Sequence, residues 1–364
     1  MSKAHELRAL TSVRGIAAWA VVLYHVRSAP AGLPQQIVDA AAKGYLAVDF
    51  FFLLSGFVIW LSWADRVRGG GTAAIAAFLQ RRIARIWPLH LAMLGFGMAL
   101  AAALALTGRA DPVTFPPAEL PLHLLLLQNW GLTSALTWND PAWSISCELA
   151  AYLLFPLLAL AIDWRRVPAP MIVAAVAALF VLLHAIFAAG GATTLGDQIT
   201  RLGVVRCLFE FAAGGAVAAM WLRWRDRPLL ALPALGLSAM LFASGGPETL
   251  IVPFAFAALL LALALTAGRR GNPLEHRALY ALGEASYATY LSHYLLWIAF
   301  KLAFIADPTE VPAPLMAGYA ALVLAASFAL YRYVELPAQA WVNGLRIGSR
   351  AERIAGRSIP PAST

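Results

Sequence analysis

Residues 44–60 read GYLAVDFFFLLSGFVIW, and this stretch decides the fold. Together with the next three residues it forms an apolar run of about twenty, the length that an α-helix needs to cross a bilayer. An outer-membrane β-barrel would instead alternate polar and apolar residues. The stretch predicts a membrane-spanning helix in which Asp49 is an unusual polar residue and Ser55-Gly56 allows close approach of a neighbouring helix.

Comparable apolar runs fill the rest of the chain. Of its 364 residues, 61% are hydrophobic and 13% are charged, and the mean hydropathy is +0.72. Soluble domains carry about twice that charged fraction, so the composition excludes soluble, disordered and collagen-like proteins. The two cysteines lie inside apolar runs and imply no disulfide framework. We predict an all-α, polytopic membrane protein with about ten transmembrane helices, at residues 9–27, 44–63, 88–107, 142–162, 168–189, 203–222, 228–244, 249–267, 286–305 and 313–334.

The basic residues indicate the orientation of these helices. With the N-terminus in the cytoplasm, 21 of the 27 lysines and arginines fall on the cytoplasmic side, as the positive-inside rule requires. The net charge of +8 is therefore interpreted as a topology signal and not as a nucleic-acid footprint. This count predicts that both termini are cytoplasmic.

Two further segments are expected to lie at the membrane surface. Residues 120–130 are too short to cross and predict a re-entrant or interfacial segment. Residues 73–87 predict an amphipathic helix on the cytoplasmic face before the third span. We expect residues 1–340 to form the membrane-embedded domain and residues 341–364 a mobile, basic cytoplasmic tail.

Ionisable residues inside the first two spans are candidates for function, because such groups are costly in a membrane. Arg14 and His25 are eleven residues apart, so they share one helix face at levels about 16 Å apart. The alternative is that Arg14 reaches the headgroups and His25 caps the helix. Asp49 lies close enough to the outer end of its span to meet His25 and orient its ring. It serves equally well as a purely structural hydrogen-bond acceptor.

The fourth predicted span carries a second polar stripe. Ser144, Glu148 and Tyr152 follow each other at intervals of four residues and therefore line one helix face. Glu148 is a candidate acid, base or orienting group if it lies near His25 or an arginine. The candidates for substrate contact are Asn129, Trp143, Ser144, Tyr152, Tyr287 and His293. Asn129 lines a polar cavity or satisfies re-entrant backbone, and the cluster of Ser286, Tyr287 and His293 is as compatible with helix packing as with substrate contact.

Arg82 and Arg85 lie three residues apart in the expected interfacial helix. Such a pair is suited to a bidentate phosphate clamp. The more common role of a basic helix face is to anchor the protein to phospholipid headgroups. No set of histidine, cysteine and carboxylate side chains has the spacing of a metal site.

Six motifs occur in one order along the chain. They are LTSVRGIAAWAVVLYH, VDFFFLLSGFVI, RRIARIWPLH, QNW followed by PAWSISCELAAYLLFP, GEASYATYLSHYLLW and YRYVELPAQ. In this the chain resembles acyltransferase family 3, the multi-pass membrane acyltransferases that modify cell-surface sugars and some antibiotics. The resemblance runs from Leu7 to Pro337.

The resemblance implies ten core helices and acyl-coenzyme A as a donor substrate taken from the cytoplasm, with no permanently bound cofactor. The family's Arg-x10-His motif falls on Arg14 and His25, and its Arg-x-x-Arg motif on Arg82 and Arg85. The acidic residue of its Trp-Ser motif falls on Glu148. Residues 149–156, LAAYLLFP, have small side chains where the family is bulkier, which bears on the identity of the acceptor.

These observations predict a membrane O-acyltransferase that moves an acyl group, acetyl by default, to a hydroxyl of a cell-surface polysaccharide or lipid-linked glycan. His25 would act as general base or as covalent acyl carrier, with Asp49 or Glu148 orienting it. One alternative acceptor is a small diffusible molecule such as a macrolide. The alternative from another class is a proton-coupled transporter, against which the lack of an internal repeat weighs. The sequence does not define the oligomeric state.

Overall fold

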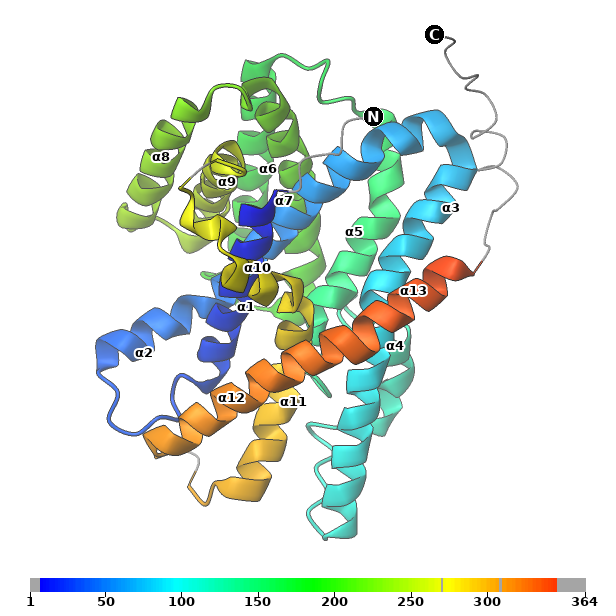
Figure 1. The fold of residues 1–364 in the computed structure, drawn as a ribbon, viewed down its shortest axis with the longest axis vertical. Helices are drawn as coiled ribbons and strands as arrows, with labels where there is room; N and C mark the ends of the chain where they lie inside the picture. Colours follow the sequence, from blue (N-terminus) through cyan, green and yellow to red (C-terminus); the bar gives the residue numbers. More distant parts are fainter. Residues whose placement is uncertain (1–6, 270, 308–309, 346–364) are drawn as a thin grey trace.

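The computed structural model describes residues 7–269, 271–307 and 310–345, and these residues form helices joined by loops (Figure 1). Within them the β-structure is limited to an isolated bridge between Pro30 and Val311. The helices are α1 (Arg8–Val26), α2 (Gln35–Ala42), α3 (Ala47–Leu106), α4 (Leu120–Leu124), α5 (Ala142–Ala161), α6 (Ala169–Ala189), α7 (Ile199–Trp224), α8 (Ala231–Ala243), α9 (Glu248–Thr266), α10 (Arg277–Glu284), α11 (Ser286–Phe304), α12 (Ala313–Leu330) and α13 (Leu336–Gly344).

The all-α membrane fold predicted from the apolar runs is confirmed, and helices occupy all ten predicted ranges. In the described part of the chain, seven helical stretches are long and apolar enough to cross a membrane. α11 is not among the seven, and α8 is a shorter apolar helix. The predicted count of ten is therefore not confirmed. α11 is less apolar than the seven because its first half is rich in serine, tyrosine and histidine.

The predicted interfacial helix is not a separate element. Residues 73–87 belong to the second arm of α3, which runs on through Pro88 to Leu106. The two arms of α3 meet at Gly71, whose φ of 56° and ψ of −149° are accessible only to glycine. Figure 1 shows the two arms diverging from this bend as an inverted V.

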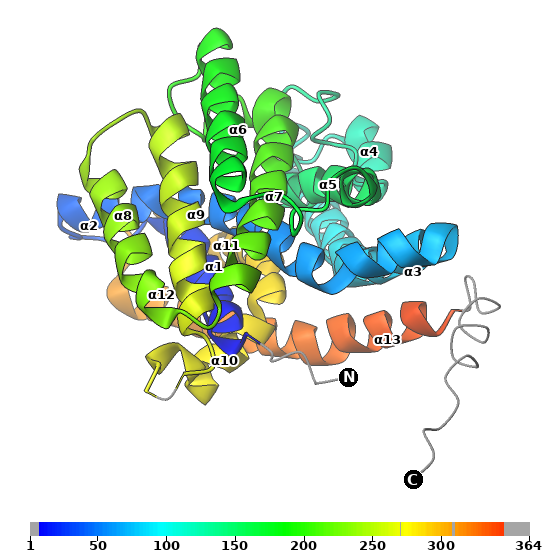
Figure 2. The same cartoon turned by 90° about the horizontal axis from the view of Figure 1, so that it is seen from above.

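The centre of the bundle is formed by α3 and α7, which approach each other through glycines. A Cβ atom at Gly56 would lie 1.9 Å from the carbonyl oxygen of Phe211, and one at Gly214 would lie 2.0 Å from that of Leu53. These contacts confirm the close helix approach predicted from Ser55-Gly56. α1, α5, α9 and α11 surround this pair (Figure 2).

The C-terminal part of the chain also differs from the prediction. α12 continues through a π-helical turn, Tyr331–Glu335, into α13, so that one rod extends from Ala313 to Gly344. Of the predicted tail, residues 346–364 lie outside the described residues. The segment 120–130 contains only the five-residue helix α4, which agrees with the prediction that it is too short to cross.

Candidate active site

A cavity of about 160 Å³ lies between α1, α3, α5 and α11, and we call it the arginine cavity after the three arginines in its lining. It gathers most of the candidate residues, although they come from four helices. α1 contributes Arg14, α3 contributes two arginines, α5 contributes its whole polar stripe and α11 contributes tyrosine and serine side chains. The candidates that line it are Arg14, Arg82, Arg85, Ser144, Glu148, Tyr152, Ser286 and Tyr287.

Positive charge exceeds negative charge at this cavity. Arg85 forms an ion pair with Glu335, a residue that is 1% exposed. Arg14 shares the cavity with Glu148, whose Oε1 accepts a hydrogen bond of 2.6 Å from Ser55. Among the described residues no carboxylate forms an ion pair with Arg82, whose buried Nε has no hydrogen-bond partner. The cavity is therefore suited to an anionic ligand.

A second cavity of about 370 Å³ lies beyond the first, and we call it the histidine cavity because His25 lines it. Val48 and Tyr290 line both cavities and so form a common wall. The hydroxyl of Tyr290 lies 2.7 Å from Ser144 Oγ, within the buried wall. Arg14 and His25 thus line two adjoining cavities, although both lie on α1.

His25 is held by a second histidine. Its Nδ1 lies 2.9 Å from the carbonyl oxygen of Val21 and 3.1 Å from Nε2 of His293. The Nδ1 of His293 in turn lies 3.1 Å from the carbonyl oxygen of Thr289. A carbonyl oxygen only accepts, so in the neutral pair each Nδ1 carries the proton and donates it. This assignment leaves the Nε2 of His25 with a free lone pair, as a general base requires.

Asp140 faces this lone pair. Its Oδ1 lies 3.9 Å from the Nε2 of His25, and its side chain is 30% exposed. Because Asp140 lines the histidine cavity, it is placed to stabilise a positive charge that forms on the His25 ring. Sequence analysis missed Asp140, since an Asn-Asp-Pro sequence before a helix reads as a turn.

The structure pairs Asp49 with Arg206 and not with His25. Asp49 is completely buried, and both its oxygens accept hydrogen bonds of 2.6 Å from Arg206, which is 1% exposed. Arg206 also donates to the carbonyl oxygen of Leu195 at 2.9 Å. A buried carboxylate whose charge is matched in this way serves structure, so Asp49 does not orient His25.

Three other candidates have distinct places. Asn129 is buried and donates through Nδ2 to Cys147 Sγ and to the carbonyl oxygen of Ile199, so it packs loop against helix. His293 is fully buried, contacts His25 and lines neither the arginine cavity nor the histidine cavity. Trp143 lines the histidine cavity, as a substrate contact would.

Sequence analysis also missed the partners of Arg85 and of Asp49. Glu335 stands in the quoted motif YRYVELPAQ, and its position between apolar residues was a usable signal. Arg206 lies inside the predicted sixth span, and the cost of an ionisable residue in a membrane span was the signal that could have identified it. Within the described residues no group of three or more histidine, cysteine and carboxylate side chains is arranged to hold a metal ion.

Together the fold and the site show a polytopic helical bundle in which a cavity lined by three arginines adjoins a cavity lined by His25. The chain belongs to acyltransferase family 3, because the model of that family's acyltransferase domain matches residues 7–332. The protein is thus an acyltransferase, and the family resemblance drawn from the six motifs is confirmed.

Individual relatives agree with this assignment. The chain is 34% identical to "Acyltransferase MdmB" of Streptomyces mycarofaciens over 80% of its own length and 79% of the relative's. It is 27% identical to "Exopolysaccharide production protein ExoZ" of Rhizobium meliloti (strain 1021), over 81% and 89%. A match at 32% identity to "Protein 2 in picA locus" of Rhizobium radiobacter covers 40% and 78%. No solved structure matches the chain significantly.

Proposed function

We propose that the protein transfers an acyl group, acetyl by default, from acyl-coenzyme A to a hydroxyl of a cell-surface polysaccharide or lipid-linked glycan. The observation that carries this proposal is that the arginine cavity and the cavity lined by His25 adjoin each other at Val48 and Tyr290. An anionic donor and a neutral acceptor can thereby reach one reaction centre from two sides.

The arginine cavity accounts for the donor. Coenzyme A carries a 3′-phosphate and a pyrophosphate, and guanidinium groups bind phosphate oxygens through charge-assisted hydrogen bonds. Arg82 has a buried Nε without a partner, whereas Arg85 is already paired with Glu335. The clamp therefore consists mainly of Arg82 and Arg14, with Arg85 held in place behind them. The pantetheine arm extends towards the wall.

The histidine cavity supplies the base. The Nε2 of His25 takes the proton of the acceptor hydroxyl, and the hydroxyl oxygen attacks the thioester carbonyl carbon. The carbon–sulfur bond breaks, and the coenzyme A thiolate recovers the proton from the imidazolium. Asp140 stabilises that imidazolium while it exists. The same lone pair also serves the alternative in which His25 carries the acyl group covalently.

The name of ExoZ connects one relative with exopolysaccharide production, and this supports a glycan acceptor. Purified protein is incubated with acetyl-coenzyme A and either a polysaccharide or a macrolide, and free thiol and O-acetyl product are measured. We expect thiol release to depend on the polysaccharide. Product with the macrolide alone would assign a small diffusible acceptor, and an intact thioester under all conditions would overturn the proposal in favour of a transporter.

The proposed location is a bacterial inner membrane with both termini in the cytoplasm, so that the donor enters from that side. Cys147 and Cys207 are buried, and single cysteines in exposed loops therefore report sidedness. In intact spheroplasts an impermeant thiol reagent should label Thr193→Cys and leave Asp226→Cys unlabelled. The opposite pattern would reverse the orientation and the side of donor entry.

A further inference from the structure

An apolar cleft of about 340 Å³ lies between α3, α5, α6 and α7, separate from the two cavities of the site. α3 separates it from the arginine cavity, since Ser55 and Ile59 line that cavity whereas their neighbours Gly56 and Trp60 line the cleft. Phe155 and Phe211 close its inner end, since both are almost completely buried.

The cleft opens sideways onto the surface of the helix bundle. Of its lining residues, Ala178 and Leu182 on α6 are exposed. In a membrane protein such an opening faces acyl chains and not water, and an apolar cleft of this kind holds a chain by van der Waals packing. The cleft is thus shaped for the hydrocarbon part of an amphiphile.

One end of the cleft borders a basic pocket. Trp60 lines the cleft and also a pocket of about 400 Å³, which Asp65, Arg165, Arg223 and Arg225 line as well. Trp60 lies under the guanidinium of Arg68 at 5.0 Å, and tryptophans in this position are typical of the boundary between lipid tails and headgroups. Apolar and basic surfaces therefore adjoin at one residue.

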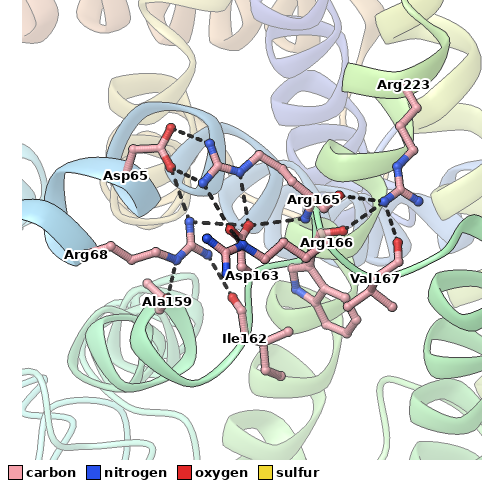
Figure 3. A network of polar contacts seen from close by, with 10 residues as sticks. Asp65, Arg68, Ala159, Ile162, Asp163, Arg165, Arg166, Val167 and Arg223 are labelled. Carbon is pink, nitrogen blue, oxygen red and sulfur yellow. Dashed lines mark hydrogen bonds and ion pairs between the residues drawn. The ribbon is translucent and has the colours of Figure 1, made fainter.

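Positive charge prevails around this pocket (Figure 3). Arg68 and Arg165 pair with Asp65 and Asp163, and a hydrogen bond from Arg165 lowers the pKa of Asp163, which keeps it ionised. Arg223 donates to loop carbonyl oxygens, including that of Arg165 at 2.9 Å. The cluster comprises five arginines and three aspartates: Arg68, Arg165, Arg166, Arg223 and Arg225, with Asp65, Asp163 and Asp226.

We infer that this cleft and its basic pocket bind one anionic phospholipid. One acyl chain lies in the cleft beside Trp60, and the phosphate lies over Arg165 and Arg225, which are 43% and 57% exposed. The excess of arginines favours a headgroup with net negative charge over a zwitterionic one. The occupant is a lipid and not the acyl donor, because α3 separates the cleft from the arginine cavity.

Native mass spectrometry of the full chain in detergent tests this inference, with dioleoyl phosphatidylglycerol, dioleoyl phosphatidylcholine and glycerol 3-phosphate as probes. We expect retention of one phosphatidylglycerol, several-fold weaker retention of phosphatidylcholine and none of glycerol 3-phosphate. Equal retention of the two lipids would overturn the charge argument, and binding of glycerol 3-phosphate alone would reduce the site to a phosphate pocket.

Two variants and two matched controls locate the lipid. Ala178→Phe fills the mouth of the cleft and should abolish retention, whereas Ala174→Phe, on an exposed position of α6 outside the cleft, should not. Arg225→Gln should weaken retention about fivefold, the effect of one charge worth about 1 kcal/mol, whereas Arg227→Gln should leave it unchanged. Unfolded variants are recognised by gel filtration. Undiminished retention by both Ala178→Phe and Arg225→Gln would overturn the assignment.

Discussion

The arginine cavity and the histidine cavity share the wall of Val48 and Tyr290 but carry different chemistry. The first is lined by three arginines and one carboxylate, Glu148; Arg85 pairs with Glu335, and Arg82 keeps an unpartnered Nε. The second holds a histidine whose free nitrogen faces a carboxylate 3.9 Å away. In the proposed mechanism the first cavity binds the anionic donor and the second removes a proton, so donor binding and catalysis should respond separately to substitution.

Loss of the base should give the largest effect. His25→Gln keeps the volume of the side chain but removes the lone pair of Nε2, and we expect kcat to fall about 10²- to 10⁴-fold. Steady-state kinetics with saturating acyl-coenzyme A measures this. The KM for the donor should change little, because the proposed phosphate site is in the other cavity. Near-normal turnover would mean that His25 is a structural cap.

Loss of an arginine should act on the donor. Arg82→Gln removes a charge-assisted contact worth about 1.5–3 kcal/mol, so the KM for acyl-coenzyme A should rise about ten- to hundredfold. Arg82→Lys should recover part of this, since an ammonium lacks the planar fork. Arg81→Gln is the matched control, because Arg81 is exposed beside Trp63 and does not line the cavity.

Dephospho-coenzyme A thioester sharpens the same comparison. If Arg82 binds the 3′-phosphate, the wild type should discriminate against this donor and the Arg82→Gln variant should not. Equal discrimination by both would move the phosphate contact to other basic residues, for which Arg269 and Arg277, the first residue of α10, are the next candidates. A loss of thermal stability without a change in KM would assign Arg82 to lipid headgroups.

Asp140 should have an intermediate effect confined to the histidine side. Asp140→Asn removes the negative charge beside His25, and because Asp140 is partly exposed its contribution is screened by solvent. We therefore expect kcat to fall about tenfold, or about 1.4 kcal/mol, while the donor KM and the melting temperature stay unchanged. An equal change in donor KM would show that the two cavities do not act separately.

The smallest effect is expected at the wall itself. Tyr290→Phe keeps the ring and loses the hydroxyl that lies 2.7 Å from Ser144 Oγ, a bond worth about 1 kcal/mol. A looser wall admits water, so acyl-coenzyme A hydrolysis without acceptor should rise up to about fivefold relative to transfer. An unchanged ratio would leave Tyr290 a packing residue only.

The apolar runs predicted the helices well because the length of a hydrophobic stretch and its bounding loops are local properties. α1, α5, α6 and α9 begin and end within a residue of the predicted bounds. The continuous second arm of α3 was missed, because an amphipathic segment joined to an apolar one looks the same whether it lies on the membrane or enters the bundle. The stripe of Ser144, Glu148 and Tyr152 was also predictable, since helical periodicity alone places it on one face.

The sequence by itself determined the class of protein, the positions of its helices and the ionisable residues that a membrane makes costly. Only the tertiary structure decided which of these residues meet. Asp49 pairs with Arg206 across 157 residues, Arg85 with Glu335 across 250, and His25 with His293 across 268. Helix packing sets such pairings, and no local pattern encodes which of several buried arginines a carboxylate reaches. Asp49 therefore pairs with Arg206, although the sequence placed it at the depth of His25. The carboxylate next to His25 is instead that of Asp140, which lies in a turn.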